Sequence, residues 1–172
     1  MKSTKKIAIA SILSALGVVI IWLGSVVEVL DLSAVALAGF AIAFAHIELK
    51  GYYPYLIYAT TAALLMLVMP IKVATLMYVC FGGVYPTVKL FAERSIRPIG
   101  MLIKGVSFVL LIGLGALGMY LIGDPFLSMG RWYLVGLCAL ALVTLAVYDY
   151  ALTVVISFYT FRLRRKIQKY LR

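Results

Sequence analysis

The sequence predicts an all-α integral membrane protein with about six transmembrane helices and both termini in the cytoplasm. Composition is the first of three observations behind this prediction: hydrophobic residues make up 65% of the 172 and charged residues only 13%. A soluble domain is about half apolar and a quarter charged. A chain of this size cannot hide so much apolar surface in water, so lipid is the solvent that suits it. The apolar runs and the positions of the basic residues are the other two observations.

Each predicted span is an apolar run bounded by charges or by helix breakers. The first run follows a basic N-terminus and is longer than the core of a signal peptide, which indicates a retained helix. Breakers interrupt the fourth run at Gly82, Gly83 and Pro86, and a broken helix in a bilayer must be covered by protein or by a water-filled cavity. The predicted spans, which form a single transmembrane domain over residues 1–172, are 7–27, 32–47, 53–69, 72–89, 99–122 and 132–155.

The basic residues predict the orientation. An even number of spans puts both ends of the chain on one side, which then holds every Lys and Arg except Lys72 and Arg131. Because positively charged loops stay inside, both termini are predicted to be cytoplasmic. Residues 156–172 continue the last helix as a basic amphipathic extension, which suits an anionic inner leaflet. The net charge of +10 does not predict nucleic-acid binding, since the basic residues form no continuous face on a soluble fold.

The sequence shows no catalytic machinery. His46 is the only histidine, which excludes an HExxH site and any metal site with two histidines. No GxSxG motif presents a serine, and no GxxxxGK[ST] motif binds ATP. Glycines 113, 115 and 118 match GxGxxG by letter, but inside a predicted span they favour close helix packing. We therefore predict that the protein is not an enzyme and needs no metal or cofactor.

Two charged residues fall inside the predicted spans. Asp149 lies well inside the sixth span, and Lys104 lies about one and a half turns into the fifth. A lone charge in hydrocarbon costs several kcal/mol, so each residue needs a partner. We predict an ion pair between Asp149 and Lys104 that clamps the last two helices. The alternative is a proton or substrate relay.

A group of polar and aromatic residues gathers at the predicted outer ends of the spans. Opposite charges and aromatic rings at a cavity mouth suit a small polar solute, whereas aromatic residues also line membrane interfaces without any ligand. The candidate substrate-binding residues are Trp22, Glu28, Asp31, Lys72, Tyr120, Asp124, Arg131 and Trp132.

The first span carries a stripe of small residues. Side chains of this size at a spacing of four let helices approach closely. They serve either packing inside the protein or docking of a second membrane protein. The stripe consists of Ala8, Ala10, Ser11, Ser14 and Ala15.

This stripe, the basic N-terminus, the predicted spans and segment 30–33 make the whole chain resemble the substrate-binding S components of energy-coupling factor (ECF) transporters. That family contacts its coupling subunit through Ala-x-x-x-Ala on the first helix. The matching pairs here are Ala10 with Ser14 and Ser11 with Ala15, and in each pair a serine replaces one alanine.

The resemblance implies a vitamin or micronutrient importer of the bacterial cytoplasmic membrane. In such a transporter this chain captures a small molecule from outside and docks to a membrane coupling subunit with cytoplasmic ATPases. A non-transporting scaffold of a cell-envelope or cell-shape complex, similar to the rod-shape MreD-type proteins, is the alternative from a different class.

Overall fold

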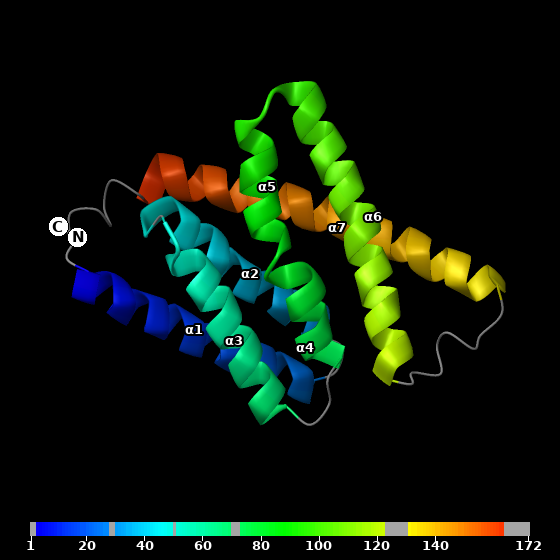
Figure 1. Cartoon of the computed structure of the whole chain (residues 1–172), viewed down its shortest axis with the longest axis horizontal. Coiled ribbons are helices and arrows are strands. Elements are labelled where there is room, and N and C mark those ends of the chain that lie inside the picture. The colour runs from blue at the N-terminus through cyan, green and yellow to red at the C-terminus, as the bar shows by residue number, and fades with distance from the viewer. Residues whose placement is uncertain (1–2, 28–29, 50, 70–72, 123–130, 164–172) are drawn as a thin grey trace.

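The computed structural model describes residues 3–27, 30–49, 51–69, 73–122 and 131–163, and within them all regular structure is helical (Figure 1). The prediction of an all-α fold is confirmed. The helices are α1 (Ser3–Val26), α2 (Asp31–Glu48), α3 (Tyr53–Val68), α4 (Val73–Met77), α5 (Tyr85–Arg94), α6 (Arg97–Ile122) and α7 (Arg131–Phe158), with π-helical segments η2 (Tyr78–Gly82) and η4 (Tyr159–Leu163).

In the described part of the chain, five helical stretches are long and apolar enough to cross a membrane, which supports the prediction of a multi-pass membrane protein. They are Ser3–Val26, Asp31–Glu48, Val73–Arg94, Pro98–Gly118 and Cys138–Arg162. Helix α3 is shorter: its 16 residues extend roughly 24 Å, against about 30 Å for a hydrocarbon core. A sixth crossing and the cytoplasmic placement of the termini stay predictions.

The fourth predicted span ends too early. We predicted residues 72–89, but the helical stretch continues through α5 to Arg94. Pro86 does not mark the end of the helix because it lies in the first turn of α5. A proline in that turn lacks only an N–H group that has no partner inside the helix anyway. Lys89 therefore lies inside a helix rather than at its end.

The stretch from α4 to α5 is a helix broken by the π-helical segment η2 and a short turn. Side chains from two other helices bond to the backbone of η2: the Tyr58 hydroxyl of α3 donates to the Val79 carbonyl at 3.2 Å, and the Tyr148 hydroxyl of α7 donates to the Gly82 carbonyl at 3.4 Å. Protein thus covers this break, as a broken helix in a bilayer requires.

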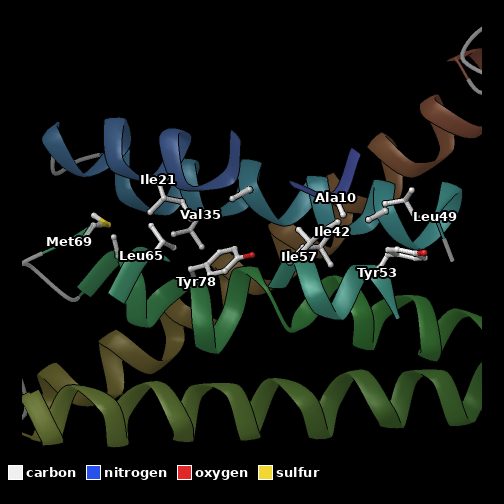
Figure 2. Close-up of a cluster of buried hydrophobic side chains, with 13 residues drawn as sticks. Ala10, Ile21, Val35, Ile42, Leu49, Tyr53, Ile57, Leu65, Met69 and Tyr78 are labelled. Atoms are coloured by element: carbon white, nitrogen blue, oxygen red, sulfur yellow. The ribbon is translucent and has the colours of Figure 1, made fainter. Parts of the chain in front are cut away.

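Two hydrophobic clusters hold the helices together. The larger cluster joins α1, α2, α3 and the α4–η2 stretch, with Ile21, Ile42 and Leu65 fully buried (Figure 2). The smaller one joins α2 to α5, α6 and α7 around Tyr85 and Leu152. Helices α6 and α7 leave most of their apolar side chains exposed, as contact with lipid requires.

Both ends of the described chain lie at one end of the molecule (Figure 1). The Ser3 hydroxyl at the start of α1 lies 3.4 Å from the Tyr53 hydroxyl at the start of α3. Tyr159 in η4 donates to Glu48 at the end of α2, at 3.1 Å. We call this region, where α1 and α3 begin and α2 and η4 end, the terminal end.

Candidate functional site

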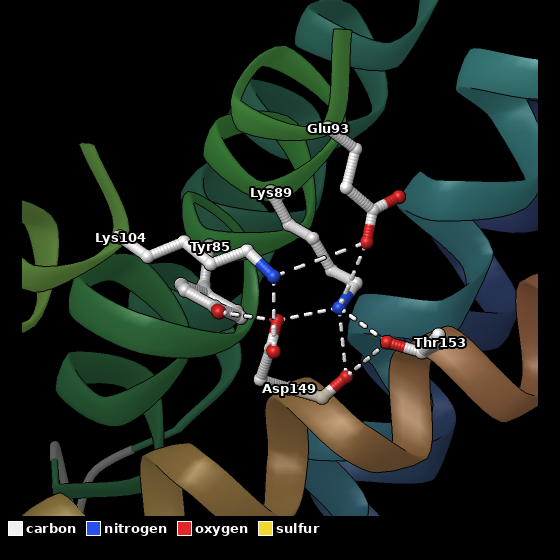
Figure 3. Close-up of polar contacts among 6 residues, drawn as sticks. All are labelled: Tyr85, Lys89, Glu93, Lys104, Asp149 and Thr153. Atoms are coloured by element: carbon white, nitrogen blue, oxygen red, sulfur yellow. Dashed lines mark hydrogen bonds and ion pairs between the residues drawn. The ribbon is translucent and has the colours of Figure 1, made fainter. Parts of the chain in front are cut away.

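A cluster of charged and hydroxyl side chains joins α5, α6 and α7, within stretches that are long and apolar enough to cross a membrane (Figure 3). Helix α5 contributes three of its residues, α6 one and α7 two. We call this set the charge cluster. Its members are Tyr85, Lys89, Glu93, Lys104, Asp149 and Thr153.

The Asp149 carboxylate lies at the centre of the charge cluster. One oxygen, Oδ1, accepts hydrogen bonds from Lys89 Nζ at 2.5 Å and from the Tyr85 hydroxyl at 2.6 Å. The other oxygen, Oδ2, accepts from Lys104 Nζ at 3.0 Å. The predicted ion pair between Asp149 and Lys104 is thus present. It is only one part of the arrangement, since Lys89 is the closer ammonium group.

Lys89 is the most buried charge in the cluster, with none of its surface exposed. Its Nζ donates to Asp149 Oδ1, to the Asp149 carbonyl at 2.8 Å and to Thr153 Oγ1 at 2.7 Å, and it lies 3.2 Å from Glu93 Oε1. A lysine has three N–H donors, so all of them have oxygen partners. Burial of an ammonium group is tolerated only with such pairing.

The prediction missed Lys89 because its span was expected to end there. The sequence nevertheless holds a signal: Tyr85, Lys89 and Glu93 recur every fourth residue, which puts them on one face of a helix. Asp149 and Thr153 have the same spacing on α7. A polar stripe on one apolar helix that matches a polar stripe on another indicates a contact between the two.

The charge cluster is electrically balanced, with two ammonium and two carboxylate groups. Lys104 bonds to Asp149 and lies 4.0 Å from Glu93, so each cation contacts both anions. The predicted clamp on the last two helices needs a correction, because the cluster joins three helices rather than two. A balanced cluster with satisfied donors suits a structural clamp better than a proton relay. Among the described residues, no group of three or more His, Cys, Asp or Glu is placed to hold a metal ion.

Only part of the predicted outer group belongs to the described structure. Glu28, Lys72 and Asp124 lie outside the described residues, as do the side chains of Arg131 and Trp132 at the start of α7. Trp22 on α1 is exposed, Asp31 begins α2, and Tyr120 on α6 is 72% exposed. Most of this group thus lies outside the described structure, and the solute site on this side stays a prediction.

The small-residue stripe on α1 divides into two faces. Ala10 and Ser14 are buried, and the Ser14 hydroxyl bonds with the Thr60 hydroxyl of α3 at 2.8 Å. These two positions therefore pack inside the protein, which corrects their assignment to partner docking. Their neighbours on the other face are exposed, namely Ala8, Ser11 and Ala15.

A cavity of about 360 Å³ lies near the terminal end, between α2, α3 and α5. His46 of α2 and Thr87 of α5 both line it and are hydrogen-bonded to each other, with the His46 Nε2 and Thr87 Oγ1 atoms 2.9 Å apart. Tyr55 and Arg94 also line the cavity. The sequence does not predict this site, because its residues come from three helices whose adjacency it does not show.

Comparison with known proteins identifies no relative of this chain. No family model, no curated protein and no solved structure matches the chain. Function is therefore inferred from the residues and their geometry.

Proposed function

We propose that this chain is the solute-binding subunit of a bacterial importer of the ECF type, in the cytoplasmic membrane and with both termini in the cytoplasm. It binds a small, vitamin-like molecule from the outer face. It then docks to a membrane coupling subunit whose cytoplasmic ATPases supply the energy, and it has no enzymatic activity or cofactor of its own. The exposed small-residue face of α1 is the observation that carries this proposal.

Helix α1 supports the proposal because its two faces differ in what they contact. The buried face, with Ala10 and Ser14, packs on α2 and α3. The opposite face exposes Ala8, Ser11 and Ala15. Lipid contact places no demand for small side chains, whereas a partner helix approaches closely only where side chains are small. The exposed face therefore suits docking. Two of its residues, Ser11 and Ala15, are one of the two pairs that match the Ala-x-x-x-Ala motif of the resemblance.

Tryptophans on this face are expected to abolish recovery of the coupling subunit. The variant Ser11→Trp with Ala15→Trp fills the exposed face and leaves the buried face intact, so the protein still folds. The measurement is the amount of coupling subunit that co-purifies with the tagged chain from a co-expression strain. Val109→Trp, at a position of α6 that is 71% exposed, is the control for an added tryptophan in lipid. Undiminished recovery with the double variant would rule out this docking face.

The importer proposal also predicts that one small molecule stabilises the purified protein. A ligand present at 100 times its Kd adds about 2.7 kcal/mol to the free energy of unfolding. Thermal unfolding in detergent with a panel of vitamins measures this effect. A rise in Tm with one member, and none with the rest, is the expected result.

A membrane scaffold is the second candidate function. The observation in its favour is the balanced charge cluster. A clamp on three helices suits a protein that keeps one shape, whereas a transport subunit changes shape as it works. A protein of this kind binds no vitamin from the panel and co-purifies with cell-envelope proteins instead of a coupling subunit. The same two measurements therefore separate the two functions.

A further inference from the structure

The cavity near the terminal end is lined by hydrogen-bond donors. His46, Tyr55, Thr87 and Arg94 each carry an N–H or O–H group, and none of the described residues that line the cavity is a carboxylate. Its volume of about 360 Å³ falls within the range of small-molecule sites, roughly 300–1,000 Å³. The composition of the lining points to a ligand that accepts hydrogen bonds and carries negative charge.

The four donors come from three helices and are held together. Thr87 and Arg94 lie about two turns apart on α5, which puts them on one face of that helix. The hydrogen bond between His46 and Thr87 fixes the end of α2 beside this face. The Tyr55 ring of α3 packs edge-on against the imidazole, with 5.6 Å between ring centroids. The site is thus assembled before any ligand arrives, which lowers the entropic cost of binding.

Two acidic side chains that lie close to these residues in sequence contact other groups. Glu48, on the same helix as His46, accepts a hydrogen bond from Tyr159 of η4. Glu93, which precedes Arg94, pairs with Lys89 in the charge cluster. Within the described part of the chain, no ion pair joins Arg94 to a carboxylate. The cavity therefore keeps the positive charge of the guanidinium group.

We propose that this cavity binds a phosphate ester, with the phosphate on Arg94, His46 and Thr87. A guanidinium group presents paired N–H donors that match two phosphate oxygens. In the hydrogen-bonded pair of His46 and Thr87 one group donates to the other, which leaves one further donor of the pair for the third oxygen. Leu90 and Phe91 give the cavity an apolar wall that suits the remainder of an ester. An anionic phospholipid and a soluble phosphate ester share this chemistry. The inference is independent of the importer function, because it uses no residue of α1.

Native mass spectrometry of the full chain in neutral detergent tests this site. Dioctanoyl-phosphatidylglycerol is expected to bind, whereas dioctanoylglycerol, which has the same chains and no phosphate, is not. Arg94→Gln is expected to weaken binding of the phospholipid at least tenfold, as the loss of a charged hydrogen bond implies. Arg162→Gln, which removes an exposed cation from η4 outside the cavity, is the matched control and leaves binding unchanged.

Competition with glycerol 3-phosphate separates the two sources of the phosphate. If it displaces the phospholipid, the ligand is a soluble phosphate ester; if it does not, the ligand is a lipid headgroup. Equal binding of dioctanoylglycerol and the phospholipid overturns the proposal, as does undiminished binding by Arg94→Gln or no binding of either phosphate compound. The comparison of the two lipids uses the unaltered protein, so it stands even if the variant misfolds.

Discussion

Asp149→Asn is expected to destabilise the protein by about 3 kcal/mol or more, because it removes a carboxylate that contacts two ammonium groups. The charge cluster then holds Lys89, Lys104 and Glu93, with one positive charge in excess. Lys89 has no exposed surface, so water cannot compensate for the lost partner. The free energy of unfolding in mixed detergent and denaturant measures the effect.

A second substitution identifies which lysine depends on Asp149. Lys89→Met and Lys104→Met each return the Asp149→Asn cluster to neutrality. Lys89 is fully buried whereas Lys104 is 27% exposed, so we expect Lys89→Met to recover more of the lost stability. Replacement of a buried charge by an apolar side chain of similar volume is often neutral or stabilising. A larger recovery with Lys104→Met would contradict the geometry of the cluster, and no recovery with either would indicate a role for Asp149 other than pairing.

The positions of the helices were predictable from sequence because the bilayer sets the length of an apolar run. The end of the fourth span was predicted wrongly because one residue type, proline, occurs in two different structural positions. Proline is found both near the end of a helix and in its first turn; the interpretation of Pro86 as a breaker near the end of the fourth span made Lys89 the last residue of that span. The need of Asp149 for a cationic partner was predictable from the cost of a charge in lipid. The identity of the closer partner was not, because it depends on the adjacency of α5 and α7.

In the candidate sites too, the sequence shows which residues share a helix face but not which other helix lies beside that face. The small residues of α1 were visible in the sequence, but which of them face inward depends on where α3 lies, as the contact between Ser14 and Thr60 shows. The cavity around His46 and Arg94 left no local pattern, since it forms only when three helix ends meet. Periodicity identifies a face of a helix, whereas tertiary contacts decide what covers that face.

Gly39→Ala carries the second large expected effect, because the α2 backbone passes very close to α7 and η2 at this glycine. A Cβ atom at this position would overlap the hydroxyl oxygen of Tyr148 and would lie 2.5 Å from the Gly82 carbonyl oxygen. The carbonyl belongs to the backbone, and the Tyr148 hydroxyl bonds to it, so neither atom moves without loss of that hydrogen bond. Overpacking of this kind costs about 1–3 kcal/mol, and we expect the upper end of that range in thermal or denaturant unfolding.

Gly113→Ala on α6 is the matched control for the Gly39 variant. A Cβ atom there meets nothing within 4 Å, so the substitution gains helix propensity, up to about 1 kcal/mol, at no steric cost. Equal stability of the two variants would mean that α2 does not approach η2 and Tyr148 as closely as described. That outcome would also mean that the Gly82 carbonyl of η2 lacks its contact with Tyr148 and α2. In lipid no water is present to bond to that carbonyl instead. The pair of glycine variants therefore tests how the broken helix is tolerated within the membrane.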